Sequence, residues 1–278
     1  MTERNNFYKN ILRGIKFSIR NSFRRKNASS VNLSWFTIKY LKHLSASKIH
    51  SRKLLKYQTF FSDGPGYLHG LKEVFIDEIY KQRLSENVYI LDCGANIGLS
   101  VIYFKSICPS ANIVAFEPDK KNFSLLQKNI ASHQLKNIDA IQAAVWINNT
   151  NIQFTHEGNM GSKITFGSDN SKKVKAIRLK NYIDRKVDFL KLDIEGAEYE
   201  VIKDIAENLY QVSKMFVEYH GTFAQNIELL EIFEIISNAG FNFYIKEAAV
   251  NYPEPFLRKQ KNQGYDVQLN IFCFRGEK

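Results

Sequence analysis

Short apolar runs alternate with segments of helical periodicity along most of the chain. Five runs have the length and the residue types of buried β-strands: 88–91, 113–116, 138–145, 187–192 and 215–220. Three further segments carry apolar residues at helical spacing: 99–107, 122–131 and 226–239. Strands that alternate with helices in this way predict an α/β, doubly wound fold with a mostly parallel sheet.

Two regions depart from this alternation. Residues 151–180 contain short β-like runs separated by glycine-containing turns, which predict a small β insertion beside the sheet. The runs 241–245 and 267–274 predict an antiparallel C-terminal hairpin. Together with the five parallel strands, this hairpin gives an expected sheet of seven strands.

Positive charge is concentrated at the beginning of the chain. The first 60 residues hold 14 Lys and Arg residues against one acid, so that the rest of the chain carries only −2 of the total net charge of +11. A turn cluster, Asp63-Gly64-Pro65-Gly66, follows this basic stretch. We therefore expect a basic, helical N-terminal extension at 1–62 and a globular domain at 63–278, with the insertion at 151–180.

The extension itself shows helical periodicity. Residues 1–26 place apolar side chains at helical spacing among basic ones, and a second helical stretch is predicted over 35–57. Basic amphipathic helices of this kind bind anionic membrane surfaces, but a helix that packs on the domain with a solvated basic face fits the same pattern. Zinc-ligand spacing and RNA-binding aromatic motifs are absent from the sequence, so a nucleic-acid partner is not expected.

Cysteine usage and hydropathy indicate the compartment. The three cysteines, Cys93, Cys108 and Cys273, are too sparse for a disulfide framework. The first residues lack the uninterrupted apolar run of a signal peptide, and no stretch reaches transmembrane length without charges. We expect a cytoplasmic protein, peripheral at the inner face of the membrane if residues 1–26 bind lipid.

The stretch 88–119 has the order strand, glycine turn, helix, strand, acid, which commonly holds an adenosine-containing cofactor. Its turn reads D-x-G-x-x-x-G, with Asn96 where a dinucleotide site has its middle glycine, so no pyrophosphate cradle is expected. Asp92 would instead attract a cation. S-adenosylmethionine fits, because its methionine end carries an ammonium and a sulfonium and its ribose offers a diol to an acid. We expect this cofactor to contact Asp92, Gly94, Ala95, Asn96, Gly98, Glu117 and Pro118.

A second group of polar residues follows the strands at 187–192 and 215–220. Asp193 and His220 stand at the carboxyl ends of these strands, where open α/β sheets bind ligands. Glu195 and Glu198 lie at the start of the next helix, where a capping role is an alternative to a catalytic one. Lys191 interrupts an apolar strand, and we expect Glu218 in the neighbouring strand to neutralise it.

Three segments resemble the FkbM-type family of S-adenosylmethionine-dependent methyltransferases: DCGANIGLS at 92–100, AFEPDKKNFSLLQKNI at 115–130 and FLKLDIEGAE at 189–198. The resemblance extends over about 70–220 and is weak outside that range. It implies a class I methyltransferase (Rossmann-like) fold and the methylation of hydroxyl groups, often on sugars of glycans or natural products. The expected acceptor is therefore a small molecule or a glycan.

Transfer of a methyl group to a hydroxyl requires removal of the hydroxyl proton. Asp193 and His220 are the candidate bases, and Glu195 is the candidate that orients the base or the substrate. These three residues could alternatively hold a divalent metal, although their spacing does not specify one. An N-methyltransferase acting on a small amine, or a non-catalytic membrane-associated protein on the same scaffold, are the alternatives.

Overall fold

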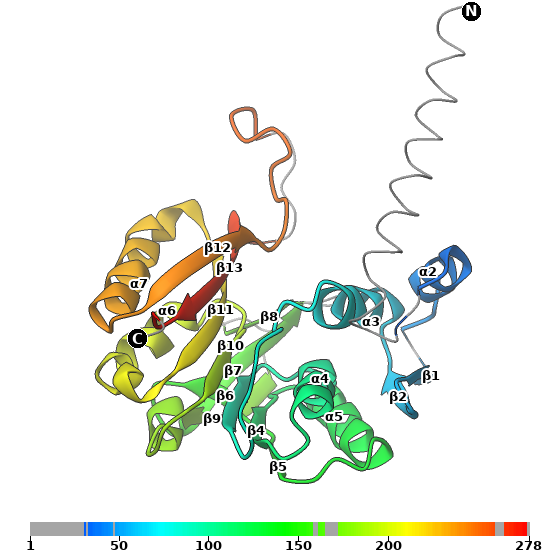
Figure 1. Cartoon of the computed structure of the whole chain (residues 1–278). Helices are drawn as coiled ribbons and strands as arrows, with labels where there is room; N and C mark the ends of the chain where they lie inside the picture. Colours follow the sequence, from blue (N-terminus) through cyan, green and yellow to red (C-terminus); the bar gives the residue numbers. More distant parts are fainter. Residues whose placement is uncertain are drawn as a thin grey trace, which may run out of the picture.

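The structure is a computed structural model that describes residues 31, 33–46, 48–157, 161–164, 172–258 and 264–276. Its centre is a seven-stranded sheet of order β12-β13-β11-β10-β3-β4-β5 (Figure 1). The strands of this sheet are β3 Tyr89–Cys93, β4 Asn112–Phe116, β5 Ile138–Ile141, β10 Phe189–Leu192, β11 Lys214–Gly221, β12 Asn242–Glu247 and β13 Val267–Phe274. β13 is antiparallel to both of its neighbours, whereas the pairs from β11 to β5 are parallel. The predicted class I methyltransferase arrangement with its C-terminal hairpin is confirmed.

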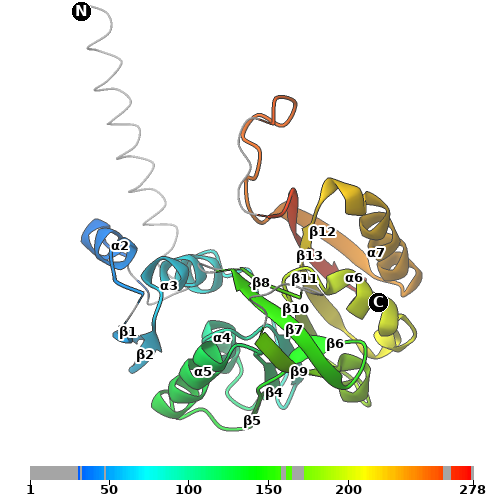
Figure 2. The ribbon, with the colours of Figure 1, turned by 180° about the vertical axis from the view of Figure 1, so that it is seen from behind.

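Helices cover both faces of this sheet, as the two opposite views show (Figures 1 and 2). Adjacent residues of one strand enter different cores: Ile90 packs with α4 and α5, whereas Leu91 packs with α6 and α7. The apolar runs of the sequence are continuous because both faces are buried. The helices of the two layers are α4 Leu99–Ile107, α5 Lys120–Ser132, α6 Glu198–Asp204 and α7 Asn226–Asn238.

The insertion forms its own four-stranded sheet, of order β6-β9-β7-β8. Its strands are β6 Ala144–Trp146, β7 Thr150–Glu157, β8 Gly161–Ile164 and β9 Lys172–Arg178. The β insertion is confirmed, but the single strand predicted at 138–145 is two. The chain leaves the large sheet after Ile141 and joins the small sheet at Ala144.

The segment before the large sheet differs most from the sequence prediction. The helix predicted over 35–57 ends early, as α2 Trp35–Lys42, and a hairpin of β1 His50–Leu54 and β2 Tyr57–Phe61 follows. The Asn129 side chain of α5 accepts from the Phe60 backbone N–H (2.6 Å) and donates to its carbonyl (2.9 Å), which fixes β2 in extended form. α3 Gly64–Gly70 and the π-helix η1 Leu71–Ile76 lead on toward β3. Residues 1–30, with the predicted amphipathic helix, lie outside the described residues.

No helix in the described part of the chain is both long enough and apolar enough to cross a bilayer.

Lys191 forms the main polar contact inside the large sheet. Its Nζ lies 3.4 Å from Asp92 Oδ1 and 3.1 Å from Asp193 Oδ2, and it donates to the Gly94 carbonyl at 2.8 Å. The predicted ion pair with Glu218 is wrong because the strand register decides the partner. Lys191 lies opposite Asp92 in β3 and opposite Phe216 in β11.

The two turns that follow β3 and β10 touch each other at Gly94. Its φ of +86° is in the left-handed region, and a Cβ built on it would overlap the carbonyl oxygen of Asp193. Glycine is therefore required at this position by both backbone conformation and space.

Replacing Lys191 by Met should strongly destabilise the fold. Asp92 is 0% exposed, and removal of its partner leaves a buried carboxylate without a counter-charge. We expect the free energy of unfolding in urea to fall by about 3–5 kcal/mol. The matched control is Lys186→Met, since Lys186 pairs with Asp188 at 2.8 Å but is mostly exposed; its expected loss is below about 1 kcal/mol. Similar losses in both variants would contradict the role of Lys191.

Replacing Gly94 by Ala separates backbone strain from overlap when it is compared with Gly264→Ala. Gly264 also has a positive φ, of +75°, but has no atom within 4 Å of its Cβ position. We expect Gly264→Ala to cost about 1–2 kcal/mol for the left-handed conformation. Gly94→Ala should cost about 1–3 kcal/mol more because the turns must move apart. Equal losses of unfolding free energy in urea would show that the Asp193 backbone moves aside at no cost and would contradict the role of this contact.

Candidate active site

Four strands of the large sheet end at one edge and carry the candidate residues there. β3 leads into the glycine turn at 94–98, β4 into Glu117 and β10 into Asp193, and His220 lies near the carboxyl end of β11. The topology places these strands side by side, in the order β11-β10-β3-β4. The candidate cofactor residues and the candidate catalytic residues therefore share the carboxyl edge, where open α/β sheets bind their ligands.

The glycine turn follows the end of β4 closely. The backbone N–H groups of Gly94 and Ala95 both donate to the carbonyl of Phe116, at 3.0 and 2.8 Å. Asn96 and Gly98 have φ values of +49° and +90°. A Cβ on Gly98 would lie 2.6 Å from Leu126 Cδ1, so the turn also packs tightly on α5. The turn requires small residues because neighbouring elements occupy the space around it.

Glu117 connects the turn to the start of α5. Its Oε2 accepts from the Asn96 N–H at 2.8 Å, and its Oε1 accepts from the Asp119 N–H at 2.9 Å. Asp119 in turn caps α5. Burial raises the pKa of Glu117 to about 7, although the two backbone hydrogen bonds oppose that rise. Pro118 lies between these two acids.

Asp92 is buried beneath the turn, and its environment differs from the sequence prediction. Its Oδ2 accepts from the Ser100 hydroxyl at 2.5 Å, and Lys191 already supplies a positive charge. Its Oδ1 accepts no hydrogen bond from any described residue, which leaves one buried acceptor near the turn. Asp92 is therefore not part of the exposed surface of the edge, and it acts there through its negative charge.

Asp193, Glu195 and His220 come together at this edge. Each offers one ligand or acceptor atom, and these atoms lie within 4.8 Å of one another. His220 Nε2 is 3.7 Å from Glu195 Oε2 and 3.5 Å from Glu218 Oε1. The two-residue spacing of Asp193 and Glu195 brings both side chains here because Glu195 and Gly196 have positive φ values of +57° and +98°.

Glu198 holds this arrangement in place. Its carboxylate accepts from the backbone N–H groups of Ile194 and Gly196, at 3.0–3.1 Å, and lies 3.4 Å from His220 Nδ1. The capping interpretation is wrong for Glu198, because α6 has no side-chain cap and Glu198 binds the backbone of the loop before the helix. The side chain of Glu195 faces His220. Because Glu198 contacts Nδ1, the Nε2 atom of His220 is directed toward the other carboxylates.

The pKa values of this cluster show an excess of negative charge. Burial raises the pKa of Glu195 to about 8, and nearby carboxylates add to the effect while His220 opposes it. Burial by itself would lower the pKa of His220, but hydrogen bonds and charges from Glu198, Glu218 and Glu195 keep it well above its ordinary value. Once its carboxyl groups are ionised, above about pH 8, a site of this kind favours a cationic ligand.

Glu73 is a member of the cluster that the sequence analysis missed. It comes from η1, and burial together with the charges of Glu218 and Asp193 raises its pKa to about 8. The only sequence signal was an acid within the otherwise apolar segment LKEVFI, and π-helices often mark functional sites. Tyr265 also contacts the cluster, since its hydroxyl donates to the Glu195 carbonyl at 2.9 Å and its ring lies 5.0 Å from that of His220.

Two buried tyrosines of the segment before β3, Tyr67 and Tyr80, belong to the core. Tyr67 stacks on Phe61 at 3.9 Å between ring centroids, and Tyr80 packs edge-on against Phe216 at 5.1 Å.

Two methyltransferases and one solved structure are similar to this chain. Methyltransferase 1 of Beauveria bassiana is 27% identical over 192 residues, which cover 58% of this chain and 77% of the relative. Methyltransferase sdnD of Sordaria araneosa is 28% identical over 185 residues, covering 52% and 71%. The crystal structure of methyltransferase FkbM from Methylobacillus flagellatus is 18% identical with a TM-score of 0.47, and the match covers 69% of this chain and 45% of that one.

The family model described as the methyltransferase FkbM domain matches residues 92–243, a range that begins at Asp92 and includes the glycine turn, Asp193, Glu195 and His220. The chain therefore belongs to the FkbM family of methyltransferases.

Proposed function

We propose that this protein transfers a methyl group from S-adenosylmethionine to a hydroxyl oxygen on a sugar of a glycan or natural product. The observation that carries the proposal is the shared sheet edge, where the glycine turn and Glu117 lie beside Asp193, Glu195 and His220. A cofactor and an acceptor that bind at this edge lie next to each other without rearrangement of the fold.

The residues present suit this cofactor. The turn offers small residues and closely packed backbone, Glu117 offers a carboxylate for a diol, and carboxyl groups outnumber cationic groups around the edge. The proposed contacts are those of Gly94, Ala95, Asn96, Gly98, Glu117 and Pro118, and Asp92 acts on the cofactor through its charge from beneath the turn. S-adenosylmethionine supplies a methyl group already activated by its sulfonium, so the protein has to position the acceptor and take up its proton.

His220 and Asp193 are the proposed proton acceptors. In its neutral form, with Nδ1–H donating to Glu198, His220 has an Nε2 lone pair that can take a hydroxyl proton, as in other carboxylate–histidine pairs. Because the surrounding carboxyl groups raise the pKa of His220, this form predominates only at alkaline pH. Asp193 is partly exposed and can receive the same proton. Glu195, 3.7 Å from Nε2, is placed to orient the imidazole or the acceptor.

The same three side chains could hold a divalent metal, which would lower the pKa of the acceptor hydroxyl instead. Treatment with a chelator, followed by re-addition of Mg²⁺ or Mn²⁺, distinguishes the two routes. Full turnover in the presence of chelator would show that a protein base removes the hydroxyl proton without a metal.

The function is tested with S-adenosylmethionine that carries a deuterated methyl group, offered with hydroxylated glycans and with small amines. Mass spectrometry and NMR of the product identify the atom that receives the label. Transfer to oxygen supports the proposal, and transfer to nitrogen supports the amine alternative. A protein that binds no cofactor in calorimetry would be a non-catalytic scaffold.

Cofactor affinity should depend on pH through Glu117. Its pKa of about 7 means that the carboxylate, which accepts hydrogen bonds from a ribose diol, predominates above that pH and is lost below it. We expect calorimetric affinity to rise up to about tenfold between pH 6 and pH 8. In Glu117→Gln the affinity at pH 8 should be weaker by about 1–3 kcal/mol, without this pH dependence. Parallel pH curves for both proteins, with equal melting temperatures, would remove Glu117 from the site.

Turnover should depend on His220 or Asp193 while cofactor affinity does not. We expect the variant that loses the base, His220→Ala or Asp193→Asn, to slow single-turnover transfer by about 10²–10⁴-fold. Matched controls are His43→Ala and Asp184→Asn, which change exposed residues outside the site. Near wild-type rates in both site variants would mean that positioning alone supports the reaction.

A further inference from the structure

The short helix α2 shows an unusual distribution of side chains. Its inner side is used for packing, since Leu41 is fully buried and a Cβ on Gly64 would overlap the Leu41 carbonyl. Its outer side carries three large aromatic residues, Trp35, Phe36 and Tyr40, whose exposed fractions are 64%, 77% and 60%. A helix that packs on a domain normally has polar residues on its outer side.

The spacing places these aromatic residues together. Positions 35 and 39, and positions 36 and 40, are one helical turn apart, so they form one face. We call this set, Trp35, Phe36, Lys39 and Tyr40, the aromatic face. Lys39 Nζ lies 5.1 Å from the centroid of the Trp35 ring, so its charge sits among the aromatic rings. α2 lies at the outer edge of the molecule in both views (Figures 1 and 2).

The charged residues of the segment that carries the aromatic face have one sign. Residues 31–62 contain Lys39, Lys42, Lys48, Arg52, Lys53 and Lys56 and no acid. All of these except Arg52 are exposed, and Arg52 links the β1–β2 hairpin to α2 through a 3.3 Å hydrogen bond to Thr37. A second copy of the chain on this face would bring like charges together, which opposes self-association.

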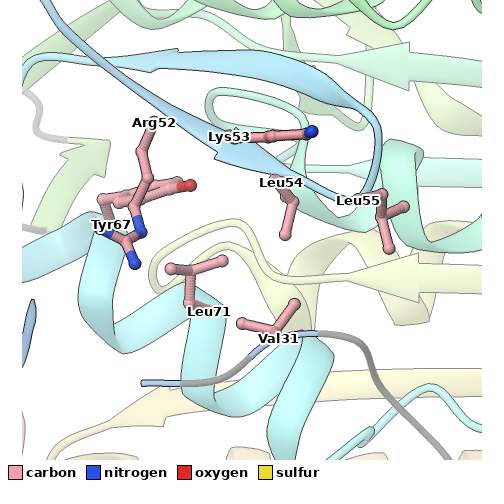
Figure 3. Close-up of a pocket in the computed structure, with 7 residues that line it drawn as sticks. All are labelled: Val31, Arg52, Lys53, Leu54, Leu55, Tyr67 and Leu71. Atoms are coloured by element: carbon pink, nitrogen blue, oxygen red, sulfur yellow. The ribbon is translucent and has the colours of Figure 1, made fainter. Parts of the chain in front are cut away.

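A cavity of about 250 Å³ lies in the same segment, between β1 and the α3–η1 helices (Figure 3). Leu54, Leu55 and Leu71 contribute apolar side chains to it, while Arg52 and Lys53 bring cationic ones. The hairpin thus repeats the combination of apolar and basic side chains seen on α2. Leu55 at its turn and Ile49 before β1 are exposed as well.

We propose that α2 docks the protein on an anionic lipid bilayer through the aromatic face. Trp and Tyr side chains favour the interface between water and lipid because they combine an apolar ring with a polar group. Lysine side chains near them are attracted to anionic head groups. The proposal rests on the described residues of α2 and not on the methyl-transfer reaction.

The test uses the fluorescence of Trp35 in the full-length chain. The chain has two tryptophans, so Trp146→Phe leaves Trp35 as the single reporter. With vesicles of phosphatidylglycerol and phosphatidylcholine, we expect a blue shift of Trp35 emission and quenching by brominated acyl chains. Vesicles of phosphatidylcholine alone should give a weaker response, because the lysines lose their attraction.

Vesicle sedimentation of the otherwise unchanged chain gives the second readout. The variant Trp35→Ala, Phe36→Ala, Tyr40→Ala should lower the partition coefficient about tenfold or more. The control Tyr210→Ala, Phe256→Ala removes aromatic residues that are equally exposed elsewhere and should leave partitioning unchanged. Unquenched Trp35, or equal sedimentation of the triple variant, would overturn the proposal. Light scattering that shows a dimer in the wild type and a monomer in the triple variant would assign the face to a second copy instead.

Discussion

A single buried ammonium group, that of Lys191, determines how the site is assembled. Taking this charge out of water is costly, and the cost is offset because Asp92 and Asp193 flank it and the Gly94 carbonyl accepts a hydrogen bond from it. These partners belong to β3, to the loop after β10 and to the glycine turn. The ion pairs therefore set the relative position of the cofactor turn and the candidate catalytic loop, and the tight approach of Gly94 to Asp193 reinforces it.

The carboxylate of Glu198 holds the loop after β10 from the side opposite Lys191. It binds the backbone of the loop and the imidazole of His220 at the same time. Lys191 and Glu198 thus enclose the segment 193–196 between a buried cation and a buried anion. The residues proposed to meet the acceptor need few contacts of their own, because their backbone is held from both sides.

Local pattern predicted the sheet, its covering helices and the glycine turn, because these depend on neighbours in sequence. Contacts between distant segments decided the rest. The partner of Lys191 depends on strand register, which places Asp92 and not Glu218 opposite it. Strand β1 was predicted as helix because its basic residues conceal the alternation of a strand. Pairing with β2, which α5 holds through Asn129 and Ser132, keeps it extended. Glu73 could not be found by motif because η1 brings it to the edge from outside the motif-bearing segments.

The surplus of carboxyl groups at the sheet edge also bears on how a catalytic cycle would end. On the proposed function, the cofactor enters with a positively charged sulfur and leaves as a neutral thioether. An acidic environment attracts the first of these more strongly than the second. The same electrostatic field therefore binds the charged reactant more tightly than the neutral thioether product, which favours release of the product after each turnover.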